Sequence, residues 1–385
     1  MRFIPVNEPL LNGNEKKYLN ECIDTGWISS EGPFIKKFEN GMASYVGRNH
    51  AVAVTNGTAA LEMAVVALGI GKGDEVIVPS FTIISCGQAI VKAGARPVLI
   101  DSDYNNFNMK VEDIESKITK NTKAIMVVHI YGLPVDMDPI LKLAKEYDLK
   151  IIEDAAEVHG QTYKGKRCGS FGDISIFSFY PNKHITTGEG GMVLTDDDDI
   201  FERCISLRNL CFSKDANNRF IHEELGWNLR MTNIQAALGV AQLEKIDEFV
   251  SQKRKIGKVY QNLLSDIDVI NLPKDCNEFA DNIYWVFAIT LKDNCSMTAK
   301  EVMKFLAEKG IGTRPFFYPL HKQPVCNKLG LFLDDKHKNA EKLYEQGFYI
   351  PSGLALNEQQ LNQVSKYNIS GNRGLGFGVW GLGFG

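Results

Sequence analysis

A lysine between two strand-like segments is the residue in this sequence best suited to covalent chemistry. Lys183 follows the apolar run 177–180 and precedes the glycine-rich loop 185–191. The amine of such a lysine can form a Schiff base with an aldehyde, and the small residues after it leave room for a cofactor. A lone loop lysine is usually only a solvent-exposed charge. The assignment therefore depends on the residues that accompany Lys183.

An acidic residue ends a second apolar run. Asp154 closes the segment 151–154, a position where open α/β sheets meet their ligands. A carboxylate there can pair with the pyridine nitrogen of pyridoxal phosphate (PLP) and keep it protonated, so that the ring accepts electrons. Taken alone, Asp154 could equally be a helix cap or a strand-end polar group.

A third feature is typical of a phosphate site. Residues 54–61 read as a strand end, a turn of small residues and a helix start, with Asn56, Gly57 and Thr58 on the turn. Free backbone N–H groups at a helix N-terminus bind phosphate. Ser178, at the end of the strand that precedes the Lys183 turn, offers a further hydroxyl. Any well-capped helix could look like this, but the three features together predict a PLP enzyme.

The elements that must position these residues are predicted by hydrophobic patterning. Seven short runs rich in Val and Ile, mostly without alternation, are typical of strands covered on both faces. Amphipathic stretches between them predict helices, so the fold class is α/β. The strands are expected at 51–54, 75–79, 97–101, 124–129, 150–153, 174–179 and 192–194, and the helices at 58–68, 85–93, 111–118 and 139–147.

A long helical pattern from Thr232 to Leu264 predicts a link to a smaller C-terminal α+β domain. That domain would contain a strand at 283–291 and helices at 299–309 and 358–366. The predicted division is a large domain over 1–240, the linking helix and small domain over 241–368, and a tail over 369–385. Glycine alternates with apolar residues in the tail, which predicts a mobile segment or, as the alternative, an extended segment docked on a neighbour.

Composition excludes several other classes. The chain has 385 residues, 44% hydrophobic and 23% charged, as expected for a soluble globular protein. Its net charge of -4 gives no support for a nucleic-acid partner. The eight cysteines form no CxxC pair and match neither a zinc site nor a disulfide framework. Without a signal peptide or an apolar run of about 18 residues, a cytoplasmic protein with no membrane contact is expected.

Further motifs carry a resemblance to a known family. They include residues 26–30 (Gly-Trp-Ile-Ser-Ser), 73–79 (Gly-Asp-Glu-Val-Ile-Val-Pro), 228–233 (Asn-Leu-Arg-Met-Thr-Asn) and 314–321 (Arg-Pro-Phe-Phe-Tyr-Pro-Leu-His). Together with the Lys183 loop, they resemble the DegT/DnrJ/EryC1/StrS sugar aminotransferases. The resemblance runs from Ile4 to about Lys366. It implies the type I, aspartate-aminotransferase-like PLP fold, with a mixed, mostly parallel sheet in the large domain.

The resemblance also implies an activity. The chain looks most similar to the branch that aminates C4 of GDP-4-keto-6-deoxy-mannose, giving GDP-perosamine for O-antigen or other polysaccharide synthesis. L-Glutamate would donate nitrogen and leave as 2-oxoglutarate, and the cofactor would alternate between PLP and its amine form, PMP. The family forms homodimers with shared active sites. The loop 185–191 and the segment 314–319 point to this branch.

The resemblance also assigns roles to residues. Lys183 and Asp154 match the catalytic lysine and the partner of the pyridine nitrogen. The cofactor residues are Asn56, Gly57, Thr58, Ile83, Asp154, Glu157, Ser178, Lys183 and Asn228, the last reaching the phosphate from the neighbouring subunit. The residues expected to face the nucleotide sugar are Trp27, Ser29, Glu189, Arg314, Phe316, Tyr318 and His321. Ile83 replaces an aromatic residue that often stacks on the ring in this family.

Other functions remain as alternatives. A related 4-aminotransferase could act on a UDP- or dTDP-linked sugar. A PLP-dependent 3-dehydratase would have histidine at position 183, and only the adjacent residue, His184, is a histidine. A non-catalytic PLP-binding regulator is also open. A nicotinamide-dependent enzyme is disfavoured, because the chain lacks a Gly-x-Gly-x-x-Gly motif after its first strand. A metal enzyme is disfavoured as well, because Glu157, His159 and His184 match no metal-ligand spacing.

Overall fold

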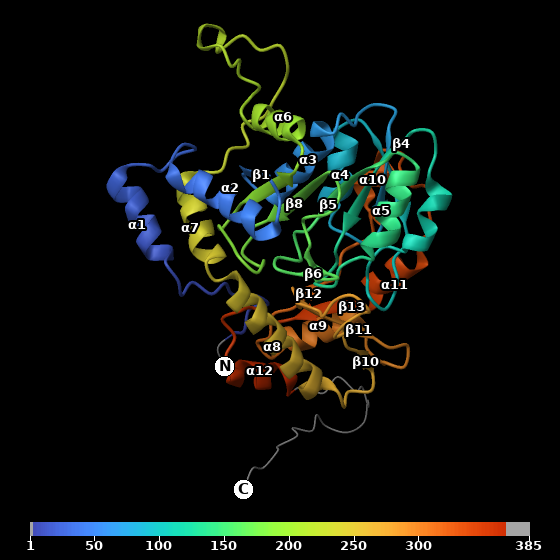
Figure 1. Cartoon of the computed structure of the whole chain (residues 1–385). Helices are drawn as coiled ribbons and strands as arrows, with labels where there is room; N and C mark the ends of the chain where they lie inside the picture. Colours follow the sequence, from blue (N-terminus) through green and yellow to red (C-terminus); the bar gives the residue numbers. More distant parts are fainter. Residues whose placement is uncertain (1–2, 367–385) are drawn as a thin grey trace.

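The computed structural model describes residues 3–366 and contains two main sheets, one at each end of the molecule (Figure 1). The strands of the larger sheet lie between residues 50 and 195, and those of the smaller sheet between residues 270 and 350. The expected domain boundary at residue 240 stays a prediction. The predicted glycine-rich tail, 369–385, lies outside the described residues.

The larger sheet confirms the expected mixed, mostly parallel arrangement. Its order is β1-β9-β8-β5-β4-β2-β3. β9 runs antiparallel to both neighbours, and the other neighbouring pairs are parallel. The carboxyl ends of β1, β8 and β5 therefore open at the same edge. The strands are His50–Val54 (β1), Glu75–Pro79 (β2), Arg96–Ile100 (β3), Thr122–Val128 (β4), Lys150–Asp154 (β5), Ile174–Ser178 (β8) and Gly191–Thr195 (β9).

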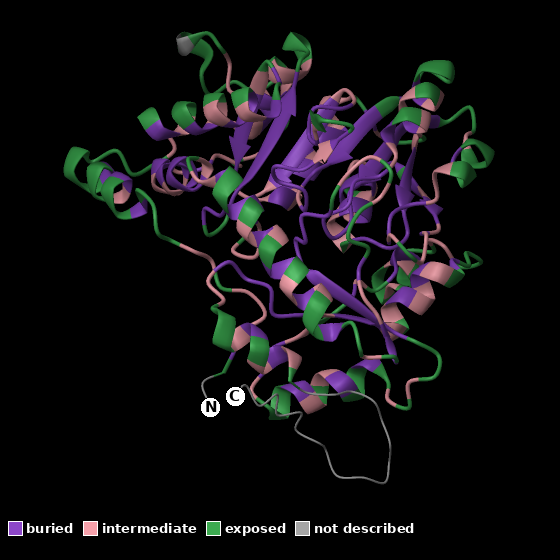
Figure 2. Ribbon diagram, turned by 60° about the horizontal axis from the view of Figure 1, so that its bottom comes forward, coloured by how far each residue is buried: buried purple, intermediate pink, exposed green. Residues whose placement is uncertain are grey.

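Helices cover both faces of this sheet, and the strands between them are buried (Figure 2). Successive residues of a strand point to opposite faces of the sheet, and each face has its own core. Ile77 lies in the core beneath α2, α5 and α7, and Val76 lies in the core beneath α3, α4 and α6. Burial of each Val or Ile side chain stabilises the folded state by roughly 1.5–3 kcal/mol relative to its exposure to water. The helices are Pro33–Val46 (α2), Gly57–Ala67 (α3), Ile84–Lys92 (α4), Met137–Glu146 (α5), Asp198–Arg208 (α6) and Asn233–Leu243 (α7).

The smaller sheet is antiparallel, in the order β10-β11-β13-β12, and packs against α8, α9 and α12. Its core includes Tyr260, Phe287 and Phe348. The strands are Ile270–Asn271 (β10), Phe287–Leu291 (β11), Arg314–Pro315 (β12) and Gly347–Ile350 (β13). The remaining elements are Glu15–Thr25 (α1), Thr162–Tyr163 (β6), Lys166–Arg167 (β7), Ile246–Leu264 (α8), Ala299–Glu308 (α9), Pro324–Lys328 (α10), Lys338–Gln346 (α11) and Glu358–Ser365 (α12).

Two helix predictions need correction. The stretch 111–118 forms two 3-10 turns instead of an α-helix, and no side chain caps its start. The pattern 232–264 is broken after α7, where Lys245 leaves helical geometry before α8 begins. α7 itself starts at a capping box in which Thr232 and Gln235 satisfy each other's backbone amides.

Candidate active site

The carboxyl edge of the larger sheet brings the three predicted features together. β1 ends just before Asn56 and α3, while β5 ends at Asp154. β8 ends at Ser178, and the turn with Lys183 follows. Only β9 separates β1 from β8, and β8 pairs directly with β5. Sequence order and strand direction thus converge on one site.

The first turn of α3 forms a cradle of backbone amides beside Ser178. The Asn56 side chain caps this helix by accepting a 2.8 Å hydrogen bond from the amide of Ala59. The amides of Gly57 and Thr58 have no partner within the helix, as in the first turn of any helix. A Cβ on Gly57 would lie 2.7 Å from the Ser178 Cβ, so a larger residue would force the two elements apart. The cradle therefore suits a phosphate group.

The neighbouring helix extends this cradle. Ser85, in the first turn of α4, places its Oγ 2.8 Å from the Oγ1 of Thr58. Ile83 immediately precedes α4, and 45% of its surface is exposed. Its side chain is thus accessible, and its packing on the face of a bound ring stays a prediction.

Lys183 lies in a largely buried position between an acid and an indole. Its Nζ is 3.8 Å from Oε1 of Glu157 and 3.9 Å from the ring centroid of Trp285. Nε1 of Trp285 donates a 2.8 Å hydrogen bond to the Asn182 carbonyl, which fixes the indole against the lysine turn. Burial lowers the pKa of Lys183, and the charges of Glu157 and Asp154 oppose that shift. More of the amine is therefore neutral, and only the neutral form attacks carbonyls or accepts protons.

Asp154 is a buried acid at the end of β5. Its Oδ1 accepts a 3.0 Å hydrogen bond from the Ala156 amide, and its Oδ2 accepts one of 3.4 Å from the Cys86 thiol. Burial raises the pKa of Asp154, while the Ala156 amide and the charge of Lys183 lower it. Within residues 3–366, no cation forms an ion pair with this carboxylate. A cationic ring nitrogen would supply the missing charge.

Glu157 completes the buried group. Its Oε2 accepts a 2.9 Å hydrogen bond from the Tyr131 amide. Burial raises the pKa of Glu157 to about 8, and the nearby Lys183 works against that rise. At neutral pH the carboxyl group therefore retains a proton far more readily than an exposed glutamate. It can donate a hydrogen bond to a ring oxygen.

A second buried pair supports this edge of the sheet. Oε1 of Glu153 lies 3.0 Å from Nε2 of His129, whose Nδ1 accepts a hydrogen bond from the Val135 amide. The proton of His129 is therefore on Nε2. Cys168 lies near both groups, so the three could resemble a metal site. Hydrogen bonds already engage both nitrogens of His129, and we interpret the pair as a structural support for the strand that ends at Asp154.

The geometry fits PLP at four points. The cradle of Gly57 and Thr58 matches the phosphate, and Asp154 matches the pyridine nitrogen. Glu157 matches the ring oxygen, and Lys183 matches the aldehyde. Two observations argue for this fit independently of any family: Gly57 lets the start of α3 lie against Ser178, where a Cβ would clash, and Asp154 is a buried carboxylate without an ion-pair partner in residues 3–366.

A chain of two hydrogen bonds orients Asp154. Oγ1 of Thr82 lies 3.3 Å from Sγ of Cys86, and this thiol donates to Asp154. Burial raises the pKa of Cys86 well above its usual range, so it stays a donor. We expect Cys86→Ala to weaken PLP binding about 2- to 10-fold, the worth of one hydrogen bond. Cys86→Ser should restore it in an absorbance titration of apoprotein; equal losses in both variants would contradict this positioning role.

Two loops with predicted substrate residues are held by the start of α7. The Trp27 carbonyl accepts a 2.7 Å hydrogen bond from the Asn233 side chain, and the Ser29 carbonyl accepts one of 2.6 Å from the Asn233 amide. The Glu189 carbonyl accepts a 2.8 Å bond from Nε2 of Gln235. The backbone of each loop is thus fixed, while the side chains of Trp27, Ser29 and Glu189 remain exposed.

Two aromatic side chains, Tyr349 and Trp285, connect Arg314 to Lys183. It pairs with Tyr349 in the register of β12 and β13. The Tyr349 ring lies 6.4 Å from the Trp285 ring, which contacts Lys183. Arg314 is exposed, and so is Tyr318 on the same segment, with 37% of its surface accessible. Both could contact a substrate.

Phe316 and His321 are buried inside the fold, and their contact with the nucleotide sugar stays a prediction. Phe316 is 2% exposed and packs with its ring centroid 5.0 Å from that of Tyr131. His321 is also buried: its Nδ1 lies 2.7 Å from Oγ of Ser80, and its Nε2 lies 2.9 Å from Oε1 of Glu341. Both ring nitrogens are engaged. The structure therefore gives these two side chains packing and hydrogen-bonding roles inside the fold.

Asn228 lies on the outer side of β1 and is exposed. The segment that carries it is held by a 3.0 Å hydrogen bond from the Thr55 amide to the Leu229 carbonyl. The Asn228 side chain accepts bonds of 3.0 and 2.8 Å from the guanidinium of Arg230. Its contact with the phosphate of a neighbouring subunit stays a prediction.

Three contributors to the site escaped the sequence reasoning: Trp285, Cys86 and Ser85. Trp285 lies inside the strand predicted at 283–291, and nothing in its spacing shows that it meets Lys183. Ser85 and Cys86 begin α4, which follows a strand of the same parallel sheet. If every helix start that follows a strand end had been considered as part of the site, Ser85 and Cys86 would both have been indicated.

Comparisons with known proteins agree with this geometry. Residues 9–367 match the profile of the DegT/DnrJ/EryC1/StrS aminotransferase family. The chain is 46% identical to a GDP-perosamine synthase of Escherichia coli O157:H7, covering 94% of this chain and 96% of the relative. It is 44% identical to the GDP-perosamine synthase of Caulobacter vibrioides, with the same coverage.

A solved structure gives the same result for the fold. The putative sugar aminotransferase Spr1654 from Streptococcus pneumoniae, in its PMP form, is 25% identical with a TM-score of 0.87. The match covers 94% of this chain and 96% of that one. The fold is thus the type I PLP fold, with a seven-stranded mixed sheet and a small antiparallel C-terminal sheet. The chain belongs to the DegT/DnrJ/EryC1/StrS aminotransferase family and is a PLP-dependent sugar aminotransferase.

Proposed function

We propose that this enzyme aminates C4 of GDP-4-keto-6-deoxy-mannose with L-glutamate, giving GDP-perosamine and 2-oxoglutarate. The observation that carries the proposal is the identity of 46% and 44% to two GDP-perosamine synthases over nearly their whole length. The buried group of Lys183, Asp154 and Glu157 supplies the acid–base chemistry that such a transfer requires. The product would serve the synthesis of O-antigen or another polysaccharide.

The roles of the active-site residues follow from their environment. Bound PLP supplies an electron sink for the carbanion formed at the donor's Cα. The lowered pKa of Lys183 lets its amine take a proton from that carbon and return one during transfer. Asp154 would keep the ring nitrogen protonated. Glu157 would donate a hydrogen bond to the ring oxygen, and the cradle of Gly57, Thr58 and Ser178 would hold the phosphate.

We assign the nucleotide sugar to the exposed residues around this group. Arg314 supplies a cation two aromatic contacts from Lys183, which suits a negatively charged diphosphate. Trp27 and Tyr318 present exposed aromatic surface that can pack on a sugar or a base. Ser29 and Glu189 add hydrogen-bonding groups on loops whose backbone is fixed.

We further propose a homodimer with shared sites. The segment 211–226 projects from the molecule beside α6 (Figure 1) and carries the exposed apolar residues Phe220, Ile221 and Leu225. An apolar arm of this kind is more stable when packed on a partner. Asn228 follows it directly in sequence, which supports its role at the partner's phosphate.

A cytoplasmic location is also proposed. Among residues 3–366 no helix has the length and apolar character needed to cross a bilayer. All eight cysteines are free thiols in the structure, as expected in a reducing compartment.

The experiment is a direct assay of the transfer. Purified enzyme with PLP, L-glutamate and GDP-4-keto-6-deoxy-mannose should yield a 4-amino sugar nucleotide by mass spectrometry. The yield should depend on glutamate. The matched substrates are the UDP- and dTDP-linked 4-keto-6-deoxy sugars, for which we expect much lower kcat/KM.

Each deviation has a distinct meaning. Preference for a UDP- or dTDP-linked sugar would overturn the assignment of GDP as the nucleotide, while the assignment of an aminotransferase reaction would stand. Conversion of the cofactor to its amine form by glutamate, with none of these sugars consumed, would leave only the donor assignment standing. Loss of water without gain of nitrogen would identify a dehydratase.

A further inference from the structure

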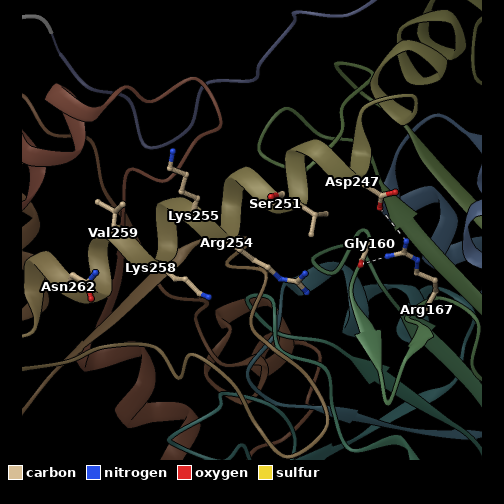
Figure 3. Close-up of a pocket in the computed structure, with 10 residues that line it drawn as sticks. Gly160, Arg167, Asp247, Ser251, Arg254, Lys255, Lys258, Val259 and Asn262 are labelled. Carbon is tan, nitrogen blue, oxygen red and sulfur yellow. Dashed lines mark hydrogen bonds and ion pairs between the residues drawn. The ribbon is translucent and has the colours of Figure 1, made fainter.

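A cavity of about 560 Å³ lies beside α8, and none of its lining residues belongs to the active site (Figure 3). Its volume is in the range of small-molecule sites. Arg254 and Lys258 point from α8 into this hollow, and Arg167 lies across from them (Figure 3). Lys255 also lines the cavity, but its side chain extends from α8 in another direction than those of Arg254 and Lys258 (Figure 3). Three cationic side chains therefore converge on one cavity.

The cavity has one acidic side chain, and other groups already engage it. Oδ1 of Asp247 accepts a 2.7 Å hydrogen bond from the Tyr45 hydroxyl and lies 3.3 Å from Nη2 of Arg167. Nη1 of Arg167 donates a 2.6 Å bond to the Gly160 carbonyl. Arg167 and Asp247 thus satisfy each other, and the charges of Arg254 and Lys258 remain uncompensated in the cavity.

Arg254 lacks the partners that a half-buried guanidinium normally has. Its Nε is buried and has no hydrogen-bond acceptor in the described part of the chain. Its Nη2 lies 3.4 Å from Oε1 of Gln161, an oxygen that already accepts a 2.9 Å bond from the Thr162 amide. Between residues 3 and 366, neither Arg254 nor Lys258 forms an ion pair. A buried unsatisfied donor calls for an acceptor from outside the chain.

We propose that this cavity is a second anion site, which binds a diphosphate group through Arg254 and Lys258. A guanidinium binds phosphate oxygens with paired N–H groups, and an ammonium adds a point charge beside it. A diphosphate carries enough charge to satisfy both. Free pyrophosphate and a nucleoside diphosphate share this chemistry. The site goes beyond the transfer reaction, because it contains none of the residues assigned to that reaction.

The test uses the PLP-loaded enzyme, so that the phosphate cradle is filled. Inorganic pyrophosphate is titrated by calorimetry into the wild type, into R254Q/K258Q and into K304Q. We expect binding to weaken at least tenfold in R254Q/K258Q and to change less than twofold in K304Q, because Lys304 is an exposed lysine of α9 that does not line the cavity. Binding should also weaken with added salt. The glutamate half-reaction should be retained in all three proteins, which verifies their folding.

Further titrations distinguish binding at this cavity from binding at the active site and show which diphosphate the cavity prefers. If pyrophosphate binding is absent in the wild type, or is lost in R314Q and kept in R254Q/K258Q, the proposal is overturned. Binding that persists in R314Q and is lost in R254Q/K258Q supports it. A parallel titration with GDP identifies the source. Tighter binding of GDP than of pyrophosphate, lost in R254Q/K258Q, indicates a nucleotide site; equal binding indicates a site for the diphosphate alone.

Discussion

Lys183→Ala should abolish amino transfer, with kcat reduced about 10³-fold or more. General acid–base groups contribute up to about 10⁴-fold, and Lys183 is the only lysine at the carboxyl edge that contacts both Glu157 and Trp285 in the described residues. The variant should still bind PLP through the cradle and Asp154. The measurement is the rate at which glutamate converts the cofactor to its amine form, followed by absorbance.

Two controls make this result specific. Lys255→Ala removes an exposed lysine of α8 and should leave the rate within about twofold, as surface changes usually do. Lys183→Arg keeps a cation but removes the readily deprotonated amine, so it should be as inactive as the alanine variant. Substantial turnover in either Lys183 variant would refute the assignment.

Asp154→Asn should separate stability from function. Because burial raises the pKa of Asp154, the folded apoprotein binds a proton there more readily than the unfolded chain does. Deprotonation at neutral pH therefore opposes folding, and the amide should leave the Tm of the apoprotein equal or higher. The holoenzyme should lose about 10²- to 10³-fold in kcat, because a buried cation would lose its carboxylate.

The two readouts of Asp154→Asn must separate: kcat falls while the Tm of the apoprotein does not. Differential scanning calorimetry of apoprotein gives the first, and single-turnover kinetics with glutamate give the second. Asp138→Asn is the control, since it removes an exposed carboxylate paired with Lys164. A parallel fall in both Tm and kcat would show that Asp154 acts by supporting the fold.

The parts of the site that lie at strand ends could be predicted from sequence. Apolar runs locate the strands, and parallel strands necessarily present their carboxyl ends at one edge, so Asn56, Asp154 and Lys183 had to converge. The contact of Trp285 with Lys183 could not be predicted in this way. Trp285 lies in the loop just before β11, and no local periodicity encodes how that loop packs against the larger sheet.

Burial divides the residues of the segment 314–321 in a way that its motif does not reveal. Membership of a motif does not say which side chains face solvent, so substrate contacts of Phe316 and His321 stay predictions. Phe316 is apolar and gains more from burial with Tyr131 than from exposure, and His321 is held by Ser80 and Glu341. The stretch 111–118 had helical spacing, but it is short and no side chain caps its start, so it forms two 3-10 turns although Ile114 is buried in the core.

The indole of Trp285 against the Lys183 amine makes the enzyme its own optical reporter. Trp285 is 4% exposed, so among the four tryptophans of the chain its emission in the apoprotein should be blue-shifted relative to that of the exposed Trp27. Bound PLP absorbs where tryptophan emits, so loading should quench that light by energy transfer over a few ångströms. The loop just before β11, which carries Trp285, and the loop that carries Lys183 come from different halves of the chain. The same signal would follow any separation of the two during turnover, without an added dye.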